Sequence, residues 1–358
     1  MPTNTAPVLR SDVLSLSTAD QTEIYSQQTW PRPFLRQLLF PRDLVFQTVA
    51  VQLNYRRYRR TLAPFIARYQ GGRILPAAPA SGQLVELPAF APTRKLHADD
   101  VLLPPGPGVW VSPDAVDLVA NTVVENWSAM ELSHSTREEW LCANLLSTGV
   151  IDLRGDEGGD FQIKFVINPP IACTIGGTPP AWNTTPEIDL ITWLQTEARA
   201  LAGKCGMRPD TLILGSAAAA IFMSNKAVQD ERHIIALNAV PGPVFEDQAV
   251  TFIGRYAGLN VYEYDGVFVT GDASGNDVVN DMIPANSAIL ASTVAAGAIV
   301  YGAISVVEDI GVQIFAATRV PTSWSDKDNS VWTQRVSSRY APSPGDTASW
   351  QTYSSVIG

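Results

Sequence analysis

The sequence has few of the side chains that metal proteins and disulfide-rich proteins rely on. It contains three cysteines (Cys142, Cys173 and Cys205) and three histidines (His97, His134 and His233). The cysteines lie at unrelated spacings and form no C-x-x-C pair, so neither a zinc site nor a disulfide framework is indicated. The histidines are not paired at the spacing of metal ligands. No metal or cofactor site is therefore predicted.

Long apolar runs are also missing. No stretch approaches the roughly 18 consecutive apolar residues of a membrane helix. The first residues, Met1–Pro7, lack the basic-then-apolar pattern of a secretion signal. We therefore expect no membrane partner, and assembly of the protein in a reducing cytoplasm.

Charge is scarce as well. Asp, Glu, Lys and Arg make up 17% of the 358 residues, below the share usual in globular proteins, whereas hydrophobic residues make up 46%. A soluble monomer normally solvates itself with more charge. Low charge with nine tryptophans and ten tyrosines therefore predicts that partners cover part of the surface. Composition alone leaves open an acidic enzyme rich in proline and alanine.

The charges that are present are mostly acidic. The net charge is −10 and the isoelectric point is about 4.8. A protein that grips nucleic acid by its phosphates needs a basic face, so sequence-specific DNA binding is not expected.

One basic cluster interrupts the acidic chain, Tyr55–Arg60, in which four arginines alternate with two tyrosines. A binder of single-stranded nucleic acid could use such a patch for phosphate contacts and base stacking. In an acidic chain the same guanidinium groups can bind carboxylates of neighbouring subunits in bidentate fashion. We favour the contact between subunits.

One serine has the surroundings of a nucleophile at first sight. The short apolar run Leu212–Gly215 predicts a buried strand, and Ser216 with its alanines then opens a helix over 217–228. A hydrolase elbow needs the pattern G-x-S-x-G, because its strained turn leaves no room for side chains. Here Gly215 directly precedes Ser216 and alanines follow. We interpret Ser216 as a helix N-cap, and no catalytic residue is predicted.

The remaining pattern mixes helices and strands, which indicates an α+β chain. Residues 114–148 contain neither Gly nor Pro, and their apolar residues recur at three-to-four spacing. This predicts one long helix starting at Ser112–Pro113 and ending at Gly149, with two helices broken near 133–135 as the alternative. A second helix is predicted from Thr185 to Gly203. Strands are predicted at 44–58, 150–153, 161–166, 211–215, 260–264, 267–270, 288–292, 312–320 and 331–340.

The segment 61–100 differs from the rest. It is rich in Pro, Gly and Ala and carries only short pieces that could form strands. So long a weakly structured segment is uncommon inside a compact domain and is typical of a functional loop or a binding arm. We predict that it contacts other subunits.

The order of several sequence blocks carries a resemblance. The blocks are, in chain order, Leu62–Phe65, Gly71–Ile74, Thr93–Asp100, Val101–Gly108, Arg319–Trp324, the alternating Val331–Tyr340, and Trp350–Ile357. Together they resemble the major capsid proteins of lambda-like tailed phages, which build icosahedral heads from the Hong Kong 97-like fold. The resemblance extends from about Pro33 to Val356 and rests on strand blocks and turns, with no catalytic signature.

This resemblance implies an α+β architecture in five parts. They are an N-terminal arm (1–43), an extended E-loop hairpin with flanking strands (44–108), a peripheral P-domain with a spine helix at 113–148 (109–185), an axial A-domain (186–310), and strands returning to the P-domain (311–358). It implies a structural protein and not an enzyme. The chain would form hexamers and pentamers of an icosahedral head that encloses double-stranded DNA, and it would reside in the virion after assembly in the host cytoplasm.

The implied partners are further copies of the chain, a scaffold, a portal and a decoration protein, and packaged DNA without sequence-specific contact. Candidate contacts between subunits are arginines, one glutamate and two aromatic residues of the arm and the extended segment. They are Trp30, Phe34, Arg56, Arg57, Arg59, Arg60, Arg68, Arg73, Glu86 and Arg94. Two alternatives stay open, an encapsulin-like protein compartment of the same fold and an α/β hydrolase that uses Ser216.

Overall fold

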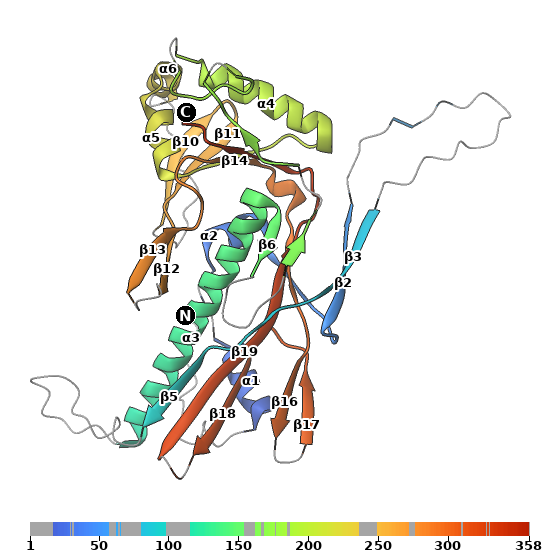
Figure 1. Ribbon diagram of the computed structural model, residues 1–358, viewed down its shortest axis with the longest axis vertical. Coiled ribbons are helices and arrows are strands. Elements are labelled where there is room, and N and C mark those ends of the chain that lie inside the picture. The colour runs from blue at the N-terminus through green and yellow to red at the C-terminus, as the bar shows by residue number, and fades with distance from the viewer. Residues whose placement is uncertain are drawn as a thin grey trace, which may run out of the picture.

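In the computed structural model, a long helix connects two six-stranded sheets that lie towards opposite ends of the subunit (Figure 1). The structure describes residues 17–28, 30, 32–56, 62–63, 65, 80–97, 115–153, 162–165, 168–175, 177–184, 187–235, 249–271, 276–308, 311–326, 328 and 330–357.

The long helix is α3 (Ala115–Thr148), 34 residues without interruption. At ~1.5 Å per residue it spans roughly 50 Å. Gly149 follows with φ 73°, the left-handed conformation that ends helices and that glycine adopts without strain. The prediction of a single helix ending at Gly149 is confirmed, and the two-helix alternative is wrong. Ser112 and Pro113, its predicted start, lie outside the described residues.

The first sheet is built around one long strand, β19, which pairs with β15, β18, β4 and β5. Strand β1 extends the sheet by pairing parallel to β15. Its strands are β1 (Arg42–Val45), β4 (Ala89–Phe90), β5 (Thr93–His97), β15 (Ala298–Tyr301), β18 (Val320–Asp326) and β19 (Val331–Ser343). Two short helices precede it in the chain, α1 (Thr18–Ser26) and α2 (Phe34–Leu39), and α1 packs on β18. The strand predicted from the alternation at Val331–Tyr340 is confirmed as part of β19.

The second sheet has the order β10-β11-β9-β14-β20-β8, with three helices near it (Figure 1). Its strands are β8 (Ile171–Ala172), β9 (Thr211–Leu214), β10 (Val250–Tyr256), β11 (Leu259–Tyr264), β14 (Ala288–Ala291) and β20 (Trp350–Ser354). The helices are α4 (Leu190–Cys205), α5 (Ser216–Ser224) and α6 (Lys226–Ile235). All four residues of β9 are buried, as expected for a strand covered on both faces.

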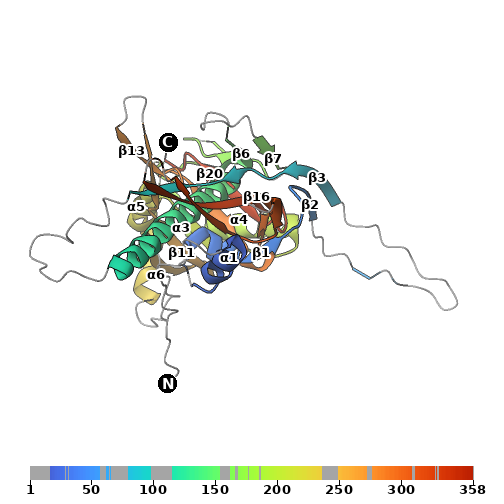
Figure 2. The same cartoon turned by 90° about the horizontal axis from the view of Figure 1, so that it is seen from below.

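Four two-stranded ribbons complete the fold, and several project from the body of the subunit (Figures 1 and 2). They are β2 (Ala50–Arg56) with β3 (Ala80–Glu86), β6 (Val150–Asp152) with β7 (Gln162–Lys164), β12 (Val267–Gly271) with β13 (Asp277–Asp281), and β16 (Ile304–Glu308) with β17 (Gly311–Phe315). The expected hairpin between 150–153 and 161–166 is thus present. The expected strand 44–58 is split, since its first residues pair with β15 and the rest with β3.

Two helix boundaries differ from the sequence prediction. Helix α4 begins after Asp189, whose carboxylate accepts hydrogen bonds from two backbone N–H groups of the first turn. It continues through Gly203 to Cys205 and ends at Gly206, which has φ 73°. The expected helix over 217–228 is two helices, because Asn225 leaves helical geometry and its side chain accepts from the N–H of Ala227. Caps at Asp189 and Asn225 therefore override the general pattern of helix-forming residues.

Besides the passage through α3, the chain crosses directly between the two sheets at 292–297 and at 344–349. The first crossing, through the 3-10 helix η4 (Thr293–Ala295), comes earlier than residue 310, where the sequence placed the return to the peripheral part. The second crossing carries β20 back into the sheet of β9 and β14, so the segment 311–358 does not belong to one sheet alone. Alternation identifies a strand but not the sheet that the strand joins.

Candidate functional site

Helix α3 carries an unusual buried polar face. Glu131, His134, Glu138 and Glu139 are 7%, 1%, 0% and 2% exposed. The spacing of Glu131, His134 and Glu138 places them along one stripe of the helix, facing the first sheet. Buried carboxylates are costly unless they are paired and hydrogen-bonded, so the surrounding elements must supply cations and donors.

Arg319, just before β18, supplies the first cation. Its Nε and Nη2 atoms donate to the two carboxylate oxygens of Glu131 at 2.9 and 3.1 Å, and Nη2 also donates to Glu138 at 2.7 Å. The Arg319 side chain is 5% exposed. Although burial alone would lower it, the pKa of Arg319 is raised well above its usual value because Glu138 and Glu131 favour the charged form. The sheet is thereby bound to two turns of α3.

Arg36, in α2, supplies the second cation. It forms a short ion pair with Glu138 and donates to Asp43 at 3.0 Å and to the hydroxyl of Tyr301 at 2.9 Å. Tyr301 in turn donates to Glu138 at 2.8 Å. Glu138 therefore connects three elements, α2, α3 and β15, through side chains that are almost wholly buried.

Glu139, the next residue, closes the N-terminus of α2. Its two oxygens accept hydrogen bonds from the backbone N–H groups of Leu35 and Arg36 at 2.7 and 3.1 Å. These are N–H groups that a helix leaves without partners, and a carboxylate is favourable there because of the helix dipole. The hydroxyl of Tyr264, at the end of β11 in the second sheet, donates to the same carboxylate at 3.0 Å. Glu139 thus joins the arm, the long helix and the second sheet.

His134 lies between these carboxylates and the first sheet. Its Nε2 atom is 3.0 Å from the carbonyl oxygen of Val336, and its Nδ1 atom is 3.3 Å from the hydroxyl of Tyr340. Burial, and then the positive charge of Arg319, lower the pKa of His134 to about 3. The imidazole is therefore neutral near pH 7, so Nε2 donates to the Val336 carbonyl.

We call Tyr25, Arg36, Glu131, His134, Glu138, Glu139, Tyr301 and Arg319 the spine network. Each charged side chain in it has a charged or hydrogen-bonding partner; Tyr25 of α1, for example, donates to Glu131 at 2.6 Å. The arrangement fastens α1, α2 and both sheets to the long helix. The sequence analysis missed it. The available signal was the seven-residue spacing of Glu131 and Glu138 on an otherwise apolar helical face.

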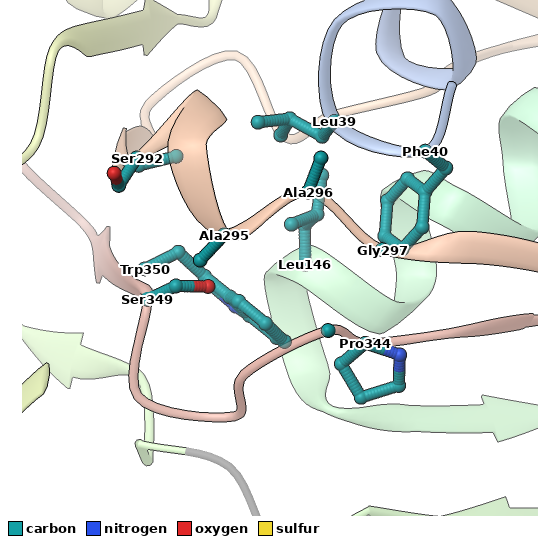
Figure 3. Close-up of a pocket in the computed structure, with 12 residues that line it drawn as sticks. Leu39, Phe40, Leu146, Ser292, Ala295, Ala296, Gly297, Pro344, Ser349 and Trp350 are labelled. Atoms are coloured by element: carbon teal, nitrogen blue, oxygen red, sulfur yellow. The ribbon is translucent and has the colours of Figure 1, made fainter. Parts of the chain in front are cut away.

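A second junction lies where the two crossings between the sheets meet, shown in Figure 3. A cavity of about 10 Å³ is left there, lined by Leu39, Phe40, Leu146 and Trp350 among others. A Cβ atom on Gly345 would lie 2.5 Å from the carbonyl oxygen of Ala296. The two crossings therefore touch backbone to backbone, which only glycine permits.

The residues considered for catalysis lie elsewhere. Ser216 is the first residue of α5 and Gly215 is the N-cap, so the predicted cap is one residue off. Because Ser216 has helical geometry, it does not occupy the strained turn of a nucleophile elbow. His97 is exposed on β5, and His233 lies on α6. Within the described ranges, no three His, Cys, Asp or Glu side chains are placed to hold a metal ion.

Apolar side chains are exposed on the ribbons. On β16, the alternate residues Ile304 and Val306 face inward and are buried, and on β17 the inward-facing Phe315 is half-buried. The opposite face shows Val307, Val312 and Ile314, which are 81%, 66% and 70% exposed. A ribbon that is apolar on both faces is typical of strands covered on both sides. The β12–β13 and β2–β3 ribbons also expose aliphatic side chains, namely Val267, Val269, Val279 and Leu84.

Comparison with known proteins gives this geometry a context. The family model described as phage major capsid protein E matches residues 17–350. The chain belongs to this capsid protein family. No curated protein sequence matches the chain.

Solved structures agree with the family. The chain is similar to the crystal structure of a prophage capsid protein of E. coli CFT073, with a TM-score of 0.68 and 16% identity, covering 95% of this chain and 99% of that one. It is also similar to a phage-related protein from Bordetella bronchiseptica RB50, with a TM-score of 0.52 and 15% identity, covering 94% and 97%. At these identities the likeness shows the fold, which is Hong Kong 97-like as the sequence predicted.

The ten predicted contact residues of this capsid protein lie in different surroundings. Glu86 and Arg94 are exposed at the surface of β3 and β5, and Trp30 is half-buried, with its ring 5.3 Å from that of Tyr25. Phe34 is fully buried and packs on Tyr262 and Tyr264 inside the subunit, so it does not present a surface to a neighbour, and that expectation is corrected. Arg56 ends β2. Arg57, Arg59, Arg60, Arg68 and Arg73 lie outside the described residues.

Phe34 was misassigned for a physical reason. It lies between prolines near the start of the chain, in a stretch that looks like an arm. Helix α2 is short but is capped by Glu139, and this cap turns Phe34 and Leu35 into the core between α3 and the second sheet. For a capsid subunit, this part of the arm stabilises its own fold.

In the described part of the chain, no helix is long and apolar enough to cross a membrane.

Proposed function

We propose that copies of this capsid protein assemble into hexamers and pentamers that tile an icosahedral phage head around double-stranded DNA. The observation that carries this proposal is the set of ribbons with apolar outward faces on a chain of the capsid family. Aliphatic side chains that are 57–81% exposed in one subunit, such as Val269 and Val307, gain stability when a second subunit covers them. Full burial of each contributes about 1.5–3 kcal/mol.

Low charge supports the same proposal. Only 17% of the residues are charged, and the exposed faces of β12–β13 and β16–β17 are made largely of Val, Ile, Ser and Thr. A subunit interface excludes charge from its centre and leaves it at the rim. Each subunit would bury far more than the ~1,600 Å² of a standard interface, because it meets neighbours on several sides.

The parts of the subunit then have the following proposed roles. The unit around the second sheet, with α4, α5 and α6, is the axial domain at the centre of a capsomer. The unit around the first sheet and α3 is the peripheral domain. The β2–β3 ribbon and the segment it carries form the extended loop that reaches a neighbouring subunit. The acidic chain faces the DNA without sequence-specific contact.

Further partners belong to the proposal as well. A scaffold would guide the curvature of the first shell, a portal would replace one pentamer, and a decoration protein would reinforce the outer surface. Assembly would take place in the host cytoplasm. The family match is to a phage capsid protein, which favours a phage head over an encapsulin-like compartment, and the helical geometry of Ser216 does not support a hydrolase.

Expression of the protein with the neighbouring genes of its phage, followed by negative-stain microscopy, tests this proposal. We expect closed shells of uniform size with visible capsomers. A variant lacking residues 57–79 and joined by a short glycine linker keeps the buried β2–β3 pair, including Val51 and Val85, and should stay folded without forming shells. Closed shells of normal size from this variant would show that the extended loop is not needed for assembly.

A further inference from the structure

The first sheet has one face packed on α3 and a second face turned away from that helix. Trp332 and Val336 of β19 belong to one apolar cluster with Trp127 of α3. Because successive side chains of a strand point to opposite faces, Thr333 and Arg335 lie on the other side of the sheet. We call this side, which also carries the side chains paired with Thr333 and Arg335 on β5 and β18, the far face of the first sheet.

Three large side chains come together on the far face. The strand register places Lys95 of β5 and Trp324 of β18 on either side of Thr333. Arg335 lies two residues further along β19, with the carbon of its guanidinium group 5.1 Å from the centre of the Trp324 ring. Trp324 is 44% exposed and Lys95 is exposed, whereas Thr333 between them is buried. The far face therefore carries two cations and an exposed indole in one patch.

The two cations have no anion of their own. Within the residues that the structure describes, neither Arg335 nor Lys95 forms an ion pair, and the Nε–H group of Arg335 has no acceptor. The carboxylate that follows Trp324 on the same face is Asp326, which accepts the backbone N–H of Asp328 at 3.1 Å. Stacking on the indole orients the guanidinium group of Arg335 but does not neutralise it.

The charge and the size of the patch indicate what it can bind. Two unpaired cations are unusual in a chain whose net charge is −10, and they favour an anionic partner. Three neighbouring strands measure about 10 Å across, because strands lie ~4.8 Å apart, and this is the width of one extended polypeptide. A DNA duplex needs a broader basic face, since it carries one phosphate charge per ~1.7 Å of its axis. An exposed indole adds an apolar contact of the kind that anchors protein interfaces.

We propose that the patch on the far face is the docking site for an acidic, extended segment of a partner protein. Carboxylates of the segment pair with Arg335 and Lys95, and an apolar side chain of the segment packs on Trp324. Arginine binds a carboxylate through two parallel N–H···O bonds, and this geometry fixes the position of the segment on the sheet. The contact needs only a folded subunit and does not depend on the closure of a shell.

Binding of a labelled peptide to the purified full-length protein tests the site. The probe is a fluorescent peptide of Glu-Ser-Leu-Ser repeats, which presents glutamate and leucine on one face when it is extended. Its anisotropy is titrated at about 50 mM salt, where exposed charges are weakly screened. We expect binding that weakens as salt is added, and no binding of the peptide with lysine in place of glutamate. Arg335→Gln together with Lys95→Gln should lower the affinity by roughly tenfold or more, and Trp324→Ser should lower it by roughly threefold or more.

The matched control is Arg199→Gln together with Lys226→Gln, which removes the same charge from exposed positions on α4 and α6. It should leave the affinity unchanged, and thermal melts show whether each variant is folded. No binding of the glutamate peptide to the unmodified chain, or equal losses in the two double variants, would overturn the inference. Tighter binding of a short DNA duplex, lost in the variant of Arg335 and Lys95, would also overturn it and assign the patch to nucleic acid. Binding by dissociated subunits but not by assembled shells would overturn it as well, because a second copy of the chain would then cover the far face.

Discussion

Replacement of Arg319 by methionine tests the spine network most sharply. The change keeps much of the side-chain volume but removes the charge that lies between Glu131 and Glu138. Three hydrogen bonds to carboxylates are lost, at 2.9, 3.1 and 2.7 Å, and hydrogen bonds to charged groups contribute about 1.5–3 kcal/mol each. Their sum is an upper bound, because Glu138 keeps Arg36 and Tyr301 while Glu131 keeps Tyr25. We expect a loss of about 3–5 kcal/mol in the free energy of unfolding, the usual cost of a buried charge that loses its partner.

Guanidinium titration of the unassembled subunit, followed by tryptophan fluorescence, measures this loss. The matched control is Arg32→Met, which removes an ion pair with Asp43 at 3.0 Å whose arginine side chain is 48% exposed. Such surface pairs contribute about 0–1 kcal/mol. If Arg319→Met cost no more than Arg32→Met, the network would be an accident of packing and the reasoning would fail. Adding Glu131→Gln to Arg319→Met should recover part of the loss, since one unpaired charge is then removed.

Three further predictions concern the spine network and the crossing at Gly345. Histidine in the unfolded chain binds a proton near pH 6.5, whereas folded His134 binds one only near pH 3. Because the unfolded state binds more protons between these values, the free energy of unfolding falls as the pH drops, by about 2 kcal/mol at pH 5. His134→Gln should flatten the dependence of the free energy of unfolding on pH between pH 7 and 5, and an unchanged slope would contradict the assignment. Glu139→Gln removes the charge that closes α2 and should cost about 1–2 kcal/mol in the same titrations, whereas no measurable loss would mean that α2 needs no cap. Gly345→Ala places a methyl group 2.5 Å from a carbonyl oxygen and should lower the free energy of unfolding by about 1–3 kcal/mol. The control Gly203→Ala in α4 meets nothing within 4 Å and should be neutral or stabilising. Equal effects of the two variants would refute the close contact between the crossings.

The sequence predicted the elements of this fold better than their arrangement. The uninterrupted run before Gly149 predicted α3, and alternation predicted β19, because both signals are local and regular. Which sheet a strand joins depends on contacts distant in sequence. Trp350–Ser354 therefore looked like a return to the peripheral part and instead pairs with β14 and β8.

Side-chain partners were harder to predict for the same reason. Glu139 and Leu35 are about a hundred residues apart, and nothing in either local pattern indicates that one caps the other. Phe34 was consequently placed on a surface although it is in the core. The exposed apolar faces of the ribbons could not be found from the sequence either, because they depend on which faces remain uncovered after folding.

The central claim is that this chain is a shell subunit whose apolar ribbon faces are covered by further copies. Sedimentation velocity of the purified protein, alone and co-expressed with its scaffold, tests this claim most directly. The account predicts capsomers or closed shells, and Val307→Asp together with Val312→Asp on the exposed β16–β17 face should shift the material towards smaller species without unfolding it. A stable 38.7 kDa monomer of the unmodified chain in every salt condition, with scaffold present, would contradict the account.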